Sequence, residues 1–393
     1  MIKRPGMIFQ LINIICALCA TVSIAWADET SDNEVKQVIT RFMEANHIPG
    51  VAVEMYVNGQ PHSYYFGMAN EQKKIPVSAN TIFEVGSLTK LMTSLVLAQE
   101  VDSAKIQLNQ PVKKYLPQLS SDFDKVTFRD LVTHTAGLEF NLPDSIKTPT
   151  QLQKYLHKLT LKNQPGQQWV YSNVSMGLLG LALEKVTHKD INELYRRKIF
   201  APLGMQTIGT IVPKNLQRFY AQGYDAQGKA IPASTLDLLP AAWCMKASAK
   251  DMQRFLSAAI GLPGTPERIF YPMRMSETAY VELANEMQGL GWRVNAITPE
   301  KVSSLLSETS MPMGPLAVHD IYTKPMFDGD ALIDKTGMTN GFRAYIALIP
   351  NKKSGIVILA NRSVGGGDVV SVGRKILFSL NHIQPVPKVE EKE

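Results

Sequence analysis

Three short motifs place side chains that could act on a serine hydroxyl. In "GSLTK", residues 86–90, a serine and a lysine lie three positions apart, directly after the apolar segment "TIFEV" at 81–85. On a helix this spacing puts both side chains on one face. The Lys90 amine could accept the proton of Ser87 if its surroundings lowered its pKa. The alternative is an ordinary helix start, with Ser87 as the cap and Lys90 in solvent.

The position of Ser87 at the start of a helix favours chemistry. The first turn of a helix leaves its backbone N–H groups unpaired, and the helix dipole favours negative charge there. The N–H of Ser87 can therefore face an oxyanion. Because one Ser-x-x-Lys match is expected by chance in a chain of this length, the motif needs support from the others.

A second motif, "YSN" at 171–173, begins an apolar helical stretch. A tyrosine close to lysine ammoniums can have a lowered pKa and act as a general base, so Tyr171 is the candidate. The amide of Asn173 could hold Lys90 and a substrate carbonyl. "YVN" at 56–58 has the same pattern, but the Asn-Gly that ends it is a hairpin turn signal, so this copy is interpreted as strand and turn.

A third motif, "KTG" at 335–337, closes a strand-like run. The N–H of Met338 could supply a second oxyanion donor, and Lys335 and Thr336 would meet a carboxylate. Gly337 would let a substrate lie against the strand backbone. Read alone, this triplet is better interpreted as a solvated turn, as is each of the other two.

Two polar residues lie just downstream, on what we expect to be the same strand. Asn340 is a candidate for substrate binding. Arg343 could make a forked contact with a carboxylate, but we favour the alternative that its side chain faces solvent.

The surrounding elements predict an α/β fold. Strand-like runs occur at 51–70 and again at 331–362, whereas helical patterns fill the middle and the C-terminal end. We expect an antiparallel sheet flanked by helices and built from both chain ends, with an inserted mostly helical domain. The expected helices are 32–48, 87–101, 148–159, 172–186, 190–200, 248–260 and 368–382. The sheet region is placed at 28–82 plus 311–388 and the helical region at 83–310, while 294–330 gives no clear pattern.

The N-terminal 27 residues have the pattern of a secretory signal peptide. Lys3 and Arg4 precede an apolar run that ends in "AWA", so we expect cleavage after Ala27 and a periplasmic protein; the alternative is an uncleaved membrane anchor. Because the segment carries two bases and no acid, its removal lowers the formal charge from +6 to +4. The remaining chain, 28–388, would be one catalytic domain with a charged tail at 389–393.

The rest of the composition excludes several classes of function. No cluster of Lys and Arg resembles a nucleic-acid patch, and no second apolar run reaches the roughly 18 residues of a membrane span. After cleavage only Cys244 remains, so an internal disulfide is impossible. The seven histidines show no metal spacing, and His134 is interpreted as a helix-end or packing residue. We expect a monomer without metal or cofactor.

The three motifs in this order resemble the class C serine β-lactamases and related penicillin-recognising enzymes. The likeness covers nearly the whole mature chain, including "TIFEVGSLTK", "LVTHTAGL", "KTGMTNGF" and "GIVILANR". The resemblance implies that Ser87 is acylated by a β-lactam, that Lys90 and Tyr171 handle its proton, and that Tyr171 activates the deacylating water. It further implies substrate contacts from Asn141, Asn173, Trp243, Lys335, Thr336 and the backbone of Met338.

The chain also departs from that family. Asn141 stands where a longer glutamine is usual, and Met338 replaces a small residue. The stretch "RSVGGGDVV" lacks the asparagine and arginine that usually help to bind the substrate carboxylate. The function implied is hydrolysis of penicillins and cephalosporins, hence antibiotic resistance. A D-alanyl-D-alanine peptidase or esterase on the same fold, and a penicillin sensor that stays acylated, are the alternatives.

Overall fold

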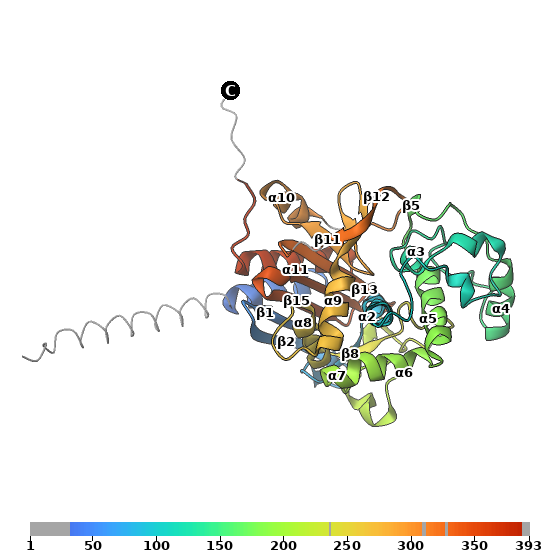
Figure 1. The fold of residues 1–393 in the computed structure, drawn as a ribbon. Coiled ribbons are helices and arrows are strands. Elements are labelled where there is room, and N and C mark those ends of the chain that lie inside the picture. The colour runs from blue at the N-terminus through green and yellow to red at the C-terminus, as the bar shows by residue number, and fades with distance from the viewer. Residues whose placement is uncertain (1–31, 236, 309–311, 327–328, 387–393) are drawn as a thin grey trace, which may run out of the picture.

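The computed structural model describes residues 32–235, 237–308, 312–326 and 329–386, and its centre is one large sheet (Figure 1). Eleven strands are hydrogen-bonded in the order β3-β2-β1-β15-β14-β13-β11-β10-β9-β12-β5, and every pair is antiparallel. The expected signal peptide and charged tail lie outside the described residues.

Both chain ends build this sheet, as expected. The hairpin of β1 and β2 turns at Asn58 and Gly59, which both have positive φ, and β1 also pairs with β15 near the C-terminus. The strands are β1 (Gly50–Val57), β2 (Gln60–Asn70), β3 (Ile75–Pro76), β5 (Gln168–Trp169), β9 (Ala279–Leu283), β10 (Met287–Gln288), β11 (Arg293–Ala296), β12 (Leu316–Met326), β13 (Ala331–Met338), β14 (Arg343–Ile349) and β15 (Ser354–Ala360). Two small sheets pair β4 (Ile82–Glu84) with β8 (Lys246–Ser248) and β6 (Gly223–Tyr224) with β7 (Ala230–Ile231).

Helices cover both faces of the sheet. The helix at 32–45 and α11 share one apolar cluster with one face of the strands, and the helices from α2 to α9 share the other. The principal helices are α2 (Thr89–Asp102), α3 (Phe128–Val132), α4 (Pro149–Lys158), α5 (Asn173–Thr187), α6 (Ile191–Tyr195), α7 (Ala201–Leu203), α8 (Ala249–Ala259), α9 (Glu267–Glu277), α10 (Pro299–Ser307) and α11 (Gly366–Leu380). Between α6 and α7 the chain forms one π-helical turn, Arg196–Phe200.

Helix α2 is the central helix of the molecule. Its residues are buried from Thr89 to Glu100, because the sheet side and α5 enclose it from different directions (Figure 1). Its buried side chains are both apolar and polar, and the polar ones include Lys90 and Thr93, which hydrogen-bond to neighbouring segments. Ser87 and Lys90 therefore lie at the junction of the sheet and the helical region.

The sheet is wider than the sequence indicated. Strands β9, β10 and β11 lie within 83–310, the range expected to be mostly helical, and β12 crosses the stretch without a clear pattern. These strands are short or carry charged residues, so alternation of apolar side chains does not reveal them. The division of the chain into two regions stays a prediction.

Candidate active site

The turn that carries Ser87 is fixed by two glycines. Ser87 lies in a 3₁₀ turn, Gly86–Leu88, and α2 follows it directly. Gly86 has φ 51°, and a Cβ there would lie 2.5 Å from the backbone nitrogen of Met338. A Cβ on Gly337 would lie 2.0 Å from the carbonyl oxygen of Val85. Gly337 is thus needed for contact between β13 and the turn, and this contact brings the backbone of Met338 next to Ser87.

Lys90 is fully buried beside Ser87. Its Nζ donates to Ser87 Oγ at 3.1 Å, to Asn173 Oδ1 at 2.6 Å and to the carbonyl oxygen of Ala242 at 2.7 Å. Burial lowers the pKa of Lys90 to about 8, although the nearby Tyr171 acts in the opposite direction. The lysine is therefore close enough to neutrality to exchange a proton with Ser87.

Tyr171 is held between two ammonium groups. Lys335 Nζ donates to its hydroxyl at 3.1 Å, and the Nζ atoms of Lys90 and Lys335 lie 4.8 and 4.5 Å from the ring centroid. Burial by itself would raise the pKa of Tyr171, but the positive charges of Lys335 and Lys90 lower it to about 7. A phenol with this pKa can act as a base at neutral pH.

Asn173 connects Lys90 to the opening of the site. Ser172 caps α5 by accepting from the N–H of Ser175, so Asn173 is the first helical residue. Its Oδ1 accepts from Lys90, and its Nδ2 donates to Asn141 Oδ1 at 2.7 Å. The Nδ2 of Asn141 then remains as a donor for a ligand.

A cavity of about 1270 Å³ opens over Ser87 and gathers the other residues named from the sequence. Tyr171 and Lys335 are buried members of its lining, and apolar and polar side chains from several loops complete it. Among its lining residues are Ser87, Asn141, Tyr171, Asn173, Trp243, Lys335, Thr336, Met338 and Asn340.

Two expectations for the segment after the third motif are wrong. Asn340 lies in the turn between β13 and β14, not on the strand, and Arg343 begins β14. Arg343 is buried rather than solvent-facing. Its Nε donates to the carbonyl oxygen of Val364, and no partner within the described residues is found for Nη1. Alternation along β14 puts Arg343 with Tyr345 on the face that α11 covers, so it lies away from Lys335.

The residues that we set aside have structural roles here. His134 follows α3 with φ 63°, and its Nδ1 accepts from the N–H of Ser172 at 3.2 Å. Burial lowers the pKa of His134 well below its usual range, so it is neutral. Burial raises the pKa of Cys244 to about 11, so the thiol is protonated. The second Tyr-x-Asn, at 56–58, lies in the first hairpin, as interpreted.

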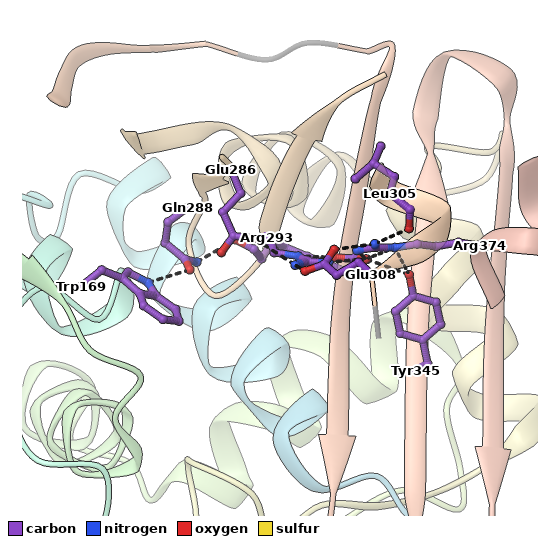
Figure 2. Close-up of polar contacts among 10 residues, drawn as sticks. Trp169, Glu286, Gln288, Arg293, Leu305, Glu308, Tyr345 and Arg374 are labelled. Atoms are coloured by element: carbon purple, nitrogen blue, oxygen red, sulfur yellow. Dashed lines mark hydrogen bonds and ion pairs between the residues drawn. The ribbon is translucent and has the colours of Figure 1, made fainter. Parts of the chain in front are cut away.

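A buried ion network behind β13 was missed by the sequence reasoning (Figure 2). Asp334 accepts from Arg293 Nε at 3.0 Å, from Arg374 Nη2 at 2.7 Å and from the Tyr345 hydroxyl at 2.7 Å. Glu308 accepts from Nη1 of both arginines at 2.6 Å. Among these residues, only the aspartate directly before the "KTG" motif could have revealed the network, because a buried strand seldom contains an unpaired acid.

The geometry is that of an activated serine nucleophile. A hydroxyl, an amine with a lowered pKa and a phenol with a lowered pKa lie in one cavity, beside a backbone N–H that can stabilise an oxyanion. Such a set can form and hydrolyse an acyl-enzyme. Within the residues that the structure covers, no group of three or more His, Cys, Asp or Glu side chains could hold a metal ion. In the same residues no helix is long and apolar enough to cross a membrane.

The sequence of this chain is similar to those of known proteins. The sequence profile of the family described as Beta-lactamase matches residues 35–380. A β-lactamase of Providencia stuartii is 31% identical over 358 residues, which cover 90% of this chain and 93% of the relative. A β-lactamase of Yersinia enterocolitica is 32% identical over 353 residues, which cover 88% and 90%.

Solved structures agree with this likeness. A class C β-lactamase in complex with cefoxitin has a TM-score of 0.84 and 32% identity, and the match covers 89% of this chain and 99% of that one. A protein described as β-lactamase/D-alanine carboxypeptidase from Pseudomonas syringae has a TM-score of 0.84 and 29% identity, with 91% and 100% covered.

Proposed function

The chain belongs to the β-lactamase family, and we propose that it hydrolyses β-lactams through an acyl-enzyme on Ser87. One observation carries this proposal: the two lysines that flank Tyr171 lower its pKa to about 7 while Lys90 contacts Ser87 Oγ at 3.1 Å. An ordinary solvated turn at either motif would not bury two ammonium groups around one phenol.

Acylation uses the residues nearest Ser87. Lys90 or the phenolate of Tyr171 takes the proton from the hydroxyl, and Ser87 Oγ bonds to the lactam carbonyl carbon. The N–H groups of Ser87 and Met338 stabilise the oxyanion. The carbon–nitrogen bond of the ring then breaks, and the nitrogen receives the proton.

Deacylation uses water and the same base. The Tyr171 phenolate takes a proton from a water molecule, which attacks the ester carbonyl carbon. The bond to Ser87 Oγ breaks, and the proton returns to the serine through Tyr171 and Lys90. No further acidic residue is needed in this scheme.

The substrate is held at both ends of the cavity. Lys335 and Thr336 face the substrate carboxylate. This chain lacks the asparagine and arginine with which the family usually makes further contacts to that group. At the other end Asn141 Nδ2 donates to the carbonyl of the acyl side chain, because Asn173 already occupies the Oδ1 of Asn141.

A chromogenic cephalosporin followed by intact mass spectrometry tests the proposal. We expect many turnovers per enzyme molecule and a transient adduct. A stable adduct without turnover would instead indicate a penicillin sensor. Absence of both, together with hydrolysis of a D-alanyl-D-alanine peptide or an ester, would indicate a peptidase or esterase.

We also propose that the enzyme acts in the periplasm as a monomer. The charged and apolar pattern of residues 1–27 supports export. N-terminal sequencing of the protein purified from the periplasmic fraction, with size-exclusion chromatography of the same sample, tests both statements. A retained leader in the cell fraction would contradict export.

A further inference from the structure

One buried histidine, His134, holds the chain on both sides of Tyr171. Its carbonyl oxygen accepts from the N–H of Val170 at 2.9 Å, and its Nδ1 accepts from the N–H of Ser172 at 3.2 Å. These two N–H groups belong to the residues directly before and directly after Tyr171. Because the backbone conformation decides which side-chain rotamers are allowed, the two contacts help to orient the phenol.

The imidazole ring of His134 also packs against the phenol itself. The ring centroids of His134 and Tyr171 lie 4.5 Å apart with an interplanar angle of 44°, and His134 is only 1% exposed. The ring of Trp169 meets the imidazole edge-on at 6.0 Å. A single residue therefore holds Tyr171 through both its backbone and its ring.

The contact with Ser172 requires a neutral imidazole. An imidazolium carries a proton on both nitrogens and cannot accept, so Nδ1 is unprotonated and the proton of His134 is on Nε2. Burial and the ammonium groups of Lys90 and Lys335 lower the pKa of His134 well below its usual range, so this state holds at neutral pH. No partner for Nε2 is found among the residues that the structure describes. Nδ1 is thus the atom through which the side chain makes its hydrogen bond.

We propose that His134 is a positioning residue for the base, which fixes the backbone around Tyr171 so that the phenol stays between Lys90 and Lys335. The proposal rests on the proposed function, in which Tyr171 is the base. A displacement of about 1 Å in a catalytic group can cost about 10²-fold in rate. Loss of the Ser172 contact should therefore reduce turnover even though no substrate contact has been removed.

The test compares His134→Leu with His134→Asn. The two new side chains branch at the same carbon and are close in size, and both lack the ring, but only asparagine presents an acceptor where Nδ1 lies. We expect kcat/KM for a cephalosporin to fall by about 10²-fold in His134→Leu, with KM nearly unchanged. His134→Asn should stay within about tenfold of the unaltered enzyme, the most that loss of one ring contact should cost.

The acidic limb of the pH profile is a second readout, which a loss of stability alone would not move. In His134→Leu the phenol is free to move away from the ammonium groups of Lys90 and Lys335, which lower its pKa. The pKa of Tyr171 should then rise, and the limb should shift to higher pH. In His134→Asn the limb should stay where it is in the unaltered enzyme.

His188→Leu is the matched control. His188 follows α5 with φ 54°, is exposed, and is absent from the cavity lining. The control therefore introduces the same leucine at a positive φ and should leave kcat/KM and the pH profile unchanged. If His134→Leu does not fold, His134→Gln replaces it, because the amide of glutamine lies one carbon farther from the backbone.

Equal losses of kcat/KM in His134→Leu and His134→Asn would overturn the inference, because the hydrogen bond would then have no role of its own. Near-normal kcat/KM in His134→Leu, or an acidic limb that stays in place there, would overturn it as well. In each of these cases the unaltered enzyme still hydrolyses β-lactams. If the unaltered enzyme forms no adduct on Ser87, the proposed function fails first and the inference falls with it.

Discussion

Two consecutive residues of β13 belong to two different buried polar clusters. Asp334 faces α11 and joins the ion network, whereas Lys335 faces the cavity and contacts Tyr171. Successive side chains of a strand point to opposite faces, so one short segment serves both clusters. The two clusters are similarly buried but differ in how their charges are matched.

In the ion network the hydrogen-bonding groups are satisfied. Both arginines share carboxylates with short contacts, and Tyr345 donates to Asp334 (Figure 2). The surrounding carboxylates overcome burial and raise the pKa of Arg293, so its charge is permanent. A network of this kind fixes strands β11, β13 and β14 to α11.

In the cavity the charges are not matched. Two ammonium groups surround one phenol, and no carboxylate hydrogen-bonds to Lys90 within the described residues. Burial lowers the pKa of Lys90 to about 8, and the charges of Lys335 and Lys90 lower that of Tyr171 to about 7. The comparison teaches that burial of charged groups alone does not identify a reactive site. Shifted pKa values of groups that line a cleft are the better indicator.

Among substitutions that keep the Ser87 nucleophile, the largest effect is expected from Tyr171→Phe, which keeps the ring and removes the proposed base. We expect kcat/KM for a cephalosporin to fall by about 10²–10⁴, the usual contribution of a general base. The midpoint of thermal unfolding should change little, because Lys335 loses only its hydrogen bond to the Tyr171 hydroxyl. Steady-state kinetics measure the loss, and near-normal turnover would transfer the role of base to Lys90.

The ion network should respond in stability instead of catalysis. Arg374→Met leaves Asp334 and Glu308 without one buried cation, which typically costs about 3–5 kcal/mol of unfolding free energy. Urea unfolding measures this. Per folded molecule, kcat should stay within a few-fold of the original. A stable variant with strongly reduced kcat would show that the network acts on the chemistry. The separation of a structural cluster from a reactive one would then be wrong.

Loss of Lys335, the proposed contact of the substrate carboxylate, should have a smaller effect, and this effect should be on substrate binding. Lys335→Ala removes one charge-assisted bond of about 1.5–3 kcal/mol, so KM for cephalosporins should rise about tenfold or more. Arg343→Ala is the matched change on the opposite face of the sheet and should leave KM unchanged. If instead Arg343→Ala raised KM and Lys335→Ala did not, the anchor would have been assigned to the wrong residue.

The smallest effect is a pH dependence. Because Tyr171 acts as a base when deprotonated and its pKa is about 7, kcat/KM should be half-maximal near pH 7 and decline as the pH falls. In Lys335→Ala the pKa of Tyr171 should rise, so this limb should move to higher pH. A profile with the same acidic limb in both proteins would contradict the proposed electrostatic cause.

The sequence predicted the reactive cluster better than the network. Ser87 and Lys90 lie within one helical turn, so local spacing defines their contact. Tyr171 and Lys335 could be placed only through a family likeness, because 164 positions separate them. Asp334 and Arg374 lie 40 positions apart. Because no local sequence pattern predicts which strand faces which helix, their contact could not be predicted.

The wrong expectation for Arg343 has the same origin. A charged residue at a strand end is usually solvated, and the sequence does not show that the segment before α11 covers it. Strands β9–β11 were missed because two to five residues carry too little periodicity. Local propensity therefore predicted helices and motifs, whereas register and layer order required the structure.

Direct mapping of the acyl group tests the central claim, that Ser87 is the nucleophile. The protein is treated with a slowly hydrolysed β-lactam, quenched in acid and analysed by intact and peptide mass spectrometry. We expect one adduct, on the peptide that contains Ser87, and none on Ser87→Ala, whose rate should fall by as much as about a millionfold. An adduct of equal yield on folded Ser87→Ala, or one mapped to another residue, would contradict the account.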